Sequence, residues 1–116
     1  MQYLLLIYAE KDAGPAYGTP EFQELMVNYR AFTAEVQEKG VLEGGNALQE
    51  VDTATCVRVR HDKTEIVDGP FAETKEQLGG YYLVDCKDLD EALKYAAKIP
   101  TAAYGTIEVR PIMVFS

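Results

Sequence analysis

The chain has 116 residues, of which 47% are hydrophobic and 26% charged, and its formal net charge at pH 7 is −8. This length predicts one domain with a single core, and the acidic balance argues against binding to nucleic acid, which depends on clustered positive charge. No apolar run approaches the roughly 20 residues that cross a bilayer, so we expect no membrane segment. Residues 1–8 lack the basic start and cleavage site of a signal peptide, which predicts a cytoplasmic protein.

The first part of the chain predicts a strand, a helix and a short strand. Residues 3–8 are apolar without alternation, which is typical of a central strand covered on both faces. Thr19 offers an N-cap oxygen ahead of Pro20, and apolar residues then recur at helical spacing until Gly40, where we expect the helix to stop. Residues 41–48 predict a short strand whose glycines favour a bulge.

A β-hairpin is predicted next. Residues 55–60 alternate between an apolar face and a face with two arginines, and residues 64–67 supply the second strand. Glu65 can face the arginines across the strands. His61, the single histidine, lies in the turn, where a charged setting favours a solvated side chain. The sequence therefore predicts no His-based metal cluster and no nucleophile activated by histidine.

The stretch from Asp68 to Gly80 has residue types that are not typical of regular packing. Pro70 forces a turn, and the Asp68 carboxylate is predicted to cap a short helical segment that Gly79 ends. Loops of this length in a small domain are uncommon unless they carry a function. Phe71, Lys75 and Leu78 share one face of this predicted turn or short helix, which Phe71 and Leu78 pin in place, while Glu73, Lys75 and Glu76 are expected near its surface.

The last third of the chain predicts a strand, a helix and a strand. Residues 81–84 are apolar with little alternation, which favours a buried strand. Asp88 and Glu91 form a capping box for a helix with a narrow apolar stripe that closes at Pro100. The final strand ends or lies at a sheet edge at Pro111, because proline cannot donate to a ladder.

In order, the elements read β-α-β, a β-hairpin, then β-α-β. This order predicts an α+β fold of the ferredoxin-like, split β-α-β type with an inserted hairpin, spanning residues 1–116 as one domain. Two helices of this size cover one face of an antiparallel sheet and leave the other face partly bare. An exposed apolar sheet face favours a second copy, so we expect a homodimer packed sheet to sheet.

The two cysteines, Cys56 and Cys86, have neither CxxC spacing nor a histidine nearby in sequence. Both fall on predicted strands, where a reduced cysteine packs as a small apolar residue. The chain also lacks the motif of any cofactor and the spacing of an EF-hand, so we predict no cofactor and no metal site.

Several segments match a known family when taken together. They are residues 3–8, 29–32, 40–45, 68–80, 90–93, 99–100 and 108–111. With these segments the chain resembles the YCII-related proteins, and within them the group named for its Asp-Gly-Pro-Phe motif, here residues 68–71. The resemblance implies a ferredoxin-like fold that dimerises as the dimeric α+β barrels do. It also implies that most members have no assigned reaction.

Some YCII-like proteins are thought to be small-molecule enzymes that use a histidine on the first helix, and the matching position here is Tyr29. A tyrosine with a pKa near 10 is a poor base at neutral pH, although it can donate a proton or a hydrogen bond. We predict Tyr29 and Asp68 as catalytic groups, and Arg30 and Arg110 as binding groups for an anion. The alternatives are a core tyrosine, a carboxylate that only caps its own loop, and two exposed surface charges.

Two functional hypotheses follow. The first is a dimeric protein that binds a small organic acid or ring compound and carries out acid–base chemistry on it. The second is a non-catalytic accessory module, because the resemblance implies association with extracytoplasmic-function sigma factors.

Overall fold

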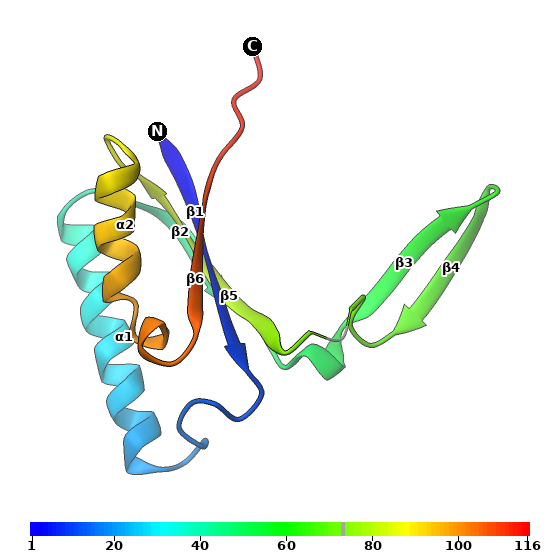
Figure 1. Ribbon diagram of the computed structural model, residues 1–116, viewed down its shortest axis with the longest axis horizontal. Coiled ribbons are helices and arrows are strands. Elements are labelled where there is room, and N and C mark those ends of the chain that lie inside the picture. The colour runs from blue at the N-terminus through cyan, green and yellow to red at the C-terminus, as the bar shows by residue number, and fades with distance from the viewer. Residues whose placement is uncertain (73) are drawn as a thin grey trace.

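The computed structural model describes residues 1–72 and 74–116, so the predicted surface position of Glu73 lies outside the described residues. Within them, a four-stranded antiparallel sheet of order β2-β5-β1-β6 carries two α-helices on one face (Figure 1). The sheet strands are β1 (Gln2–Glu10), β2 (Leu42–Ala47), β5 (Glu76–Asp85) and β6 (Thr106–Pro111), and the helices are α1 (Pro20–Glu38) and α2 (Leu89–Lys98). This arrangement confirms the ferredoxin-like α+β fold.

Both helices begin where local capping signals predict. The Thr19 hydroxyl accepts a hydrogen bond from the Phe22 backbone N–H, and Pro20 occupies the first helical position of α1. The Asp88 carboxylate accepts from the Glu91 N–H at the start of α2. Gly40, just beyond α1, has a φ of +73°, a value that glycine adopts without strain. Helix ends are predictable because these signals act within one turn.

The core lies between the helices and one face of the sheet. Leu5 of β1, Val36 of α1, Val84 of β5 and Ile99 are fully buried there. The prediction that β1 is covered on both faces is wrong, because every second residue of this strand is only half-buried. These residues lie on the face opposite the helices, which we call the bare face. By strand register it carries Leu4, Leu6, Tyr8, Tyr81, Leu83, Glu108 and Arg110.

The predicted short helix around residues 70–79 is also wrong. β5 begins at Glu76, so Gly79 and Gly80 lie within a strand rather than at a helix end. A Cβ atom on Gly80 would lie 2.9 Å from the backbone oxygen of Asn46 in the neighbouring strand. Position 80 therefore requires glycine because the neighbouring strand lies so close. This contact is distant in sequence, so the residues around Gly80 do not predict it. Phe71, expected to pack, is 76% exposed and lies 5.1 Å from the Arg58 guanidinium.

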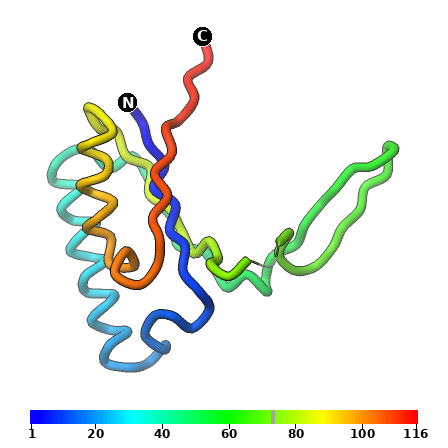
Figure 2. Tube along the Cα trace, in the orientation of Figure 1, coloured from blue at the N-terminus to red at the C-terminus, as the bar shows by residue number. Residues whose placement is uncertain are grey.

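The predicted hairpin forms from β3 (Thr55–Arg60) and β4 (Lys63–Asp68), and Glu65 pairs with Arg58 as expected. His61 and Asp62 at its tip have φ values of 51° and 62°, the signature of a two-residue turn that suits hairpin twist. The two strands pair with each other and form a separate sheet. We call residues 55–68 the arm, because they project from the body on the side away from the helices (Figures 1 and 2).

Three smaller expectations also meet the structure. The register of β2 against β5 shifts between Leu42 and Gly44, which confirms an irregularity near the glycines of this strand. Pro111 is the last residue of β6, and β6 is an edge strand as predicted. Cys86 is buried and lies just past the end of β5, whereas Cys56 is half-buried in β3.

Candidate functional site

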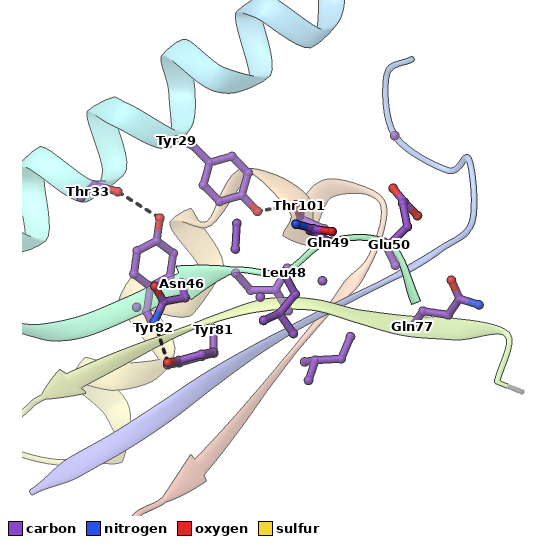
Figure 3. Close-up of a pocket in the computed structure, with 18 of the residues that line it drawn as sticks. Tyr29, Thr33, Asn46, Leu48, Gln49, Glu50, Gln77, Tyr81, Tyr82 and Thr101 are labelled. Atoms are coloured by element: carbon purple, nitrogen blue, oxygen red, sulfur yellow. Dashed lines mark hydrogen bonds between the residues drawn. The ribbon is translucent and has the colours of Figure 1, made fainter. Parts of the chain in front are cut away.

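A cavity of about 880 Å³ opens between α1 and one end of the sheet (Figure 3). Its other walls come from the loop before α1, the segment that follows β2, and the short 3₁₀ helix η2 (Pro100–Ala103) with the residues after it. This volume falls in the range of small-molecule sites, about 300–1,000 Å³. The cavity brings together five segments that are far apart in the sequence.

Tyr29 of α1 reaches across the cavity wall and shares a hydrogen bond with the Thr101 hydroxyl of η2. Thr101 is buried, and its hydroxyl also lies 3.5 Å from the hydroxyl of Tyr104. Burial raises the pKa of Tyr29 above its ordinary value, and the hydrogen bond to Thr101 opposes only part of that effect. Tyr29 is therefore protonated at neutral pH, where it can donate a hydrogen bond or a proton.

A second hydroxyl pair lies farther along α1. Thr33 and Tyr82 of β5 are joined by a 2.9 Å hydrogen bond, and the Tyr82 ring packs edge-on against Phe32. Because side chains alternate along a strand, Tyr81 points to the other face, where its hydroxyl accepts a hydrogen bond from the Asn46 amide. Figure 3 shows Tyr29, Thr33, Tyr82 and Thr101 around the cavity. These hydroxyls can each donate and accept.

The charged residues that line the cavity are mostly acidic. In the described part of the chain they are Glu10, Asp12, Glu43 and Glu50, with Lys11 as the basic residue among them. Glu10 also contacts Lys75 at 3.3 Å, between two exposed side chains that interact weakly in water. The lining therefore carries net negative charge, which disfavours an anionic ligand.

The predicted site residues do not gather in one place within the chain. Tyr29 lines the cavity, but Asp68, Arg30 and Arg110 are absent from the lining that the described residues form. Arg30 follows Tyr29 on α1 and is exposed, since adjacent helix residues point in different directions. Arg110 lies on the bare face and donates to Glu108 at 2.7 Å. Their catalytic and binding roles stay predictions.

Asp68 ends β4 at the base of the arm and is exposed. Its carboxylate was expected to cap a short helical segment, but β4 is followed instead by a backbone contact at the base of the arm, where the Gly69 N–H donates to the Ala54 carbonyl at 2.7 Å. Gly69 has a φ of +101°, so the glycine of the Asp-Gly-Pro-Phe motif serves the turn directly. The structure thus places the motif at the junction between the arm and β5.

Sequence reasoning missed Thr33, Tyr82, Thr101 and Tyr104 as residues of the site. The available signal was compositional, since the chain has eight tyrosines in 116 residues, and a buried tyrosine hydroxyl usually needs a hydrogen-bond partner. Their meeting point depends on tertiary contacts. For example, a Cβ on Gly14 would lie 2.6 Å from the Tyr104 hydroxyl, so a loop glycine admits this ring.

The described residues also address metal binding and membrane insertion. Among residues 1–72 and 74–116, no three His, Cys, Asp or Glu side chains are grouped so that they could hold a metal ion. Over the same ranges, no helix combines the length and apolar character needed to span a membrane.

Comparison with known proteins agrees with the fold. The profile of the YCII-related domain matches residues 1–116. An uncharacterised protein of Rhizobium meliloti (strain 1021) is 38% identical over 119 residues, an alignment that covers 99% of this chain and 94% of that protein. A domain match over the whole sequence, together with a relative that is 38% identical and covered over 94% of its length, shows that the chain belongs to the YCII-related family.

Proposed function

We propose that this protein is a homodimer that binds a small, uncharged ring compound in the cavity beside Tyr29. The observation that carries the proposal is the pair of hydroxyl contacts, Tyr29 with Thr101 and Thr33 with Tyr82, in a wall that also presents apolar side chains, among them Met26, Leu48 and Val51. Such a wall binds a flat ring by contact, while the hydroxyls orient its polar substituents.

The charge of the lining supports an uncharged ligand over the organic acid that the sequence also suggested. A carboxylate in this cavity would meet Glu10, Asp12, Glu43 and Glu50, and Lys11 alone would oppose them among the described lining residues. The guanidinium groups predicted to hold an acid, those of Arg30 and Arg110, lie outside this lining. A neutral ring with hydroxyl, carbonyl or amide substituents avoids this repulsion.

In any acid–base chemistry, Tyr29 would act as the proton donor. Its raised pKa keeps the phenol protonated, so it can polarise a carbonyl or protonate a leaving oxygen, but it cannot remove a proton at neutral pH. A base would have to be a carboxylate: the lining itself holds acidic residues, and Asp68 is the carboxylate that the sequence predicts. Because Asp68 does not line this cavity in its own chain, catalysis by both groups needs a second copy to supply it.

The ligand proposal can be tested with two matched ring compounds, the neutral benzamide and the anionic benzoate. We expect backbone amide shifts in NMR spectra at Tyr29, Thr33 and Thr101 on addition of benzamide, and none with benzoate. Tyr29→Phe should weaken the benzamide response several-fold, whereas Tyr17→Phe, at an exposed ring, should leave it unchanged. Shifts that cluster elsewhere, or a stronger response to benzoate, would overturn the proposal.

The alternative is a non-catalytic accessory module that meets a sigma factor. It is favoured by the absence of a histidine on α1 and by the raised pKa of Tyr29, which keeps its phenol from acting as a base at neutral pH. It depends on membership of the Asp-Gly-Pro-Phe group, which stays a prediction, as do the sigma-factor partner and the cytoplasmic location. Co-purification with a sigma factor encoded nearby, retained in Tyr29→Phe, would favour this alternative.

A further inference from the structure

The arm has two unlike faces. Strand register places Val57, Val59 and Ile66 on one face, together with Thr55, Thr64 and Asp68. The other face carries Arg58, Arg60, Lys63 and Glu65, together with Cys56 and the exposed Val67. Val57, Val59 and Ile66 are 62%, 58% and 67% exposed, so within the chain little covers them. We call these three residues the apolar strip. An isolated two-stranded hairpin is marginal in water, so an arm with an uncovered apolar strip is a surface suited to a partner.

The arm makes the chain larger than a compact domain. The radius of gyration is 16.3 Å, against about 13–14 Å for a compact domain of this length. The overall extents are 48 × 47 × 19 Å, so body and arm lie in one flat slab. In that slab the arm projects beyond the side of the sheet that the helices leave uncovered (Figure 1). The bare face and the arm therefore bound the same open region.

The area of the bare face points to a second copy that also engages the arm. Four strands paired over about six residues give a flat footprint of about 400 Å². A standard interface buries about 800 Å² per partner. One face of the arm adds about 200 Å² and, under twofold symmetry, each copy also receives its partner's arm, which brings the contact to about 800 Å² per copy.

Charge favours the same occupant. The arm contains three basic and three acidic residues, so the net charge of −8 resides in the rest of the chain. Two bodies that meet sheet to sheet repel each other at long range. The arm has no net charge, so its contact with the partner's acidic body adds no such repulsion, while Arg58, Arg60 and Lys63 stay solvated on the face opposite the apolar strip.

We propose that the arm is an exchanged dimerisation element: each copy packs its apolar strip against the body of the other, beside the sheet-to-sheet contact. The inference rests on the homodimer of the proposed function but not on its ligand. It assigns the hairpin that interrupts the split β-α-β plan a role in assembly. It also explains why an exposed apolar strip coexists with well-formed turn geometry at His61 and Asp62.

The test compares two pairs of substitutions at neighbouring positions in the arm register. Val57→Ser with Ile66→Ser removes most of the apolar strip, and Arg58→Ser with Glu65→Ser alters the adjacent cross-strand pair on the other face. Sedimentation velocity across protein concentration gives the dimer dissociation constant of each. We expect the Val57 and Ile66 pair to raise the dissociation constant at least tenfold, and the Arg58 and Glu65 pair to raise it less than threefold. All four side chains are exposed, so far-UV circular dichroism should be unchanged.

A second measurement uses the unmodified protein. Hydrogen exchange of arm amides should slow as protein concentration rises through the dissociation constant, because association covers the hairpin. A dimer with an unchanged dissociation constant in the Val57 and Ile66 variant, or arm exchange independent of concentration, overturns the arm inference alone. A wild-type protein that stays monomeric at about 100 μM overturns the homodimer as well. Loss of ligand binding in an intact dimer bears only on the cavity.

Discussion

Tyr29 and Thr101 lie 72 residues apart in the sequence and share a hydrogen bond that ties the first helix to the segment after the second. Thr101 is 6% exposed, so its hydroxyl has little access to water. The contact joins the two β-α-β halves at the wall of the cavity. Tyr29 therefore both stabilises the packing of α1 and is the most direct candidate for contact with a ligand.

Removing that tie should cost stability. Tyr29→Phe keeps the ring but leaves the Thr101 hydroxyl with the longer Tyr104 contact, so we expect a loss of about 1 kcal/mol in the free energy of unfolding. Urea denaturation followed by circular dichroism measures this difference. Tyr17→Phe, at a ring that is 89% exposed, is the control and should change the midpoint little. Equal midpoints for all three proteins would contradict the structural role of the contact.

The bare face should control association. Leu6→Arg places a charge in the centre of this face, and burial of an unpaired charge opposes dimerisation, so we expect a monomer at concentrations where the wild type is dimeric. Leu93→Arg, on the exposed side of α2, is the matched control and should remain dimeric. Light scattering coupled to gel filtration distinguishes these results. A dimer that survives Leu6→Arg would place the interface elsewhere.

Two adjacent glycines should respond differently to alanine. A Cβ on Gly80 would press on the backbone of β2 at Asn46, whereas a Cβ on Gly79 would have its nearest neighbour at 4.0 Å. We therefore expect Gly80→Ala to destabilise the fold by about 1–3 kcal/mol and Gly79→Ala to have a smaller effect. Thermal unfolding measures both. The opposite order would support the helix end that the sequence suggested at Gly79.

Cys86 should resist thiol reagents in the folded protein and should make the stability of the fold decline at alkaline pH. Burial, and the nearby Glu91, raise the pKa of Cys86 to about 11, whereas a thiol in an unfolded chain titrates near pH 8.5. The folded state holds this proton longer, so the stability that protonation gives is complete below about pH 8.5 and declines as pH rises toward 11.

Urea unfolding at several pH values measures this decline, and Cys86→Ala should reduce it. A thiol reagent at pH 8 should leave Cys86 unmodified in the folded protein and react with it after unfolding. Rapid labelling of Cys86 in the folded state would contradict its burial.

The outcome of sequence reasoning depends on the range over which each cause acts. Thr19 and Asp88 locate the helix starts because a cap acts on its own turn. Gly80 misled the interpretation because the reason for a glycine there lies in strand β2, distant in sequence. Tyr29 was identified by resemblance, but its partner Thr101 belongs to a 3₁₀ helix that no periodic pattern announces. Contacts between residues distant in sequence determine which side chains line the site, so the sequence could predict only some of them.

Pro111 also limits how large an assembly of this chain becomes. It ends β6, an outer strand, and leaves that position without an amide to donate to an incoming strand. At the opposite margin, the irregular register of β2 near Gly44 disturbs the row of groups that an added strand would need. Growth by edge-to-edge addition, the route to fibrils, is thus discouraged on both margins.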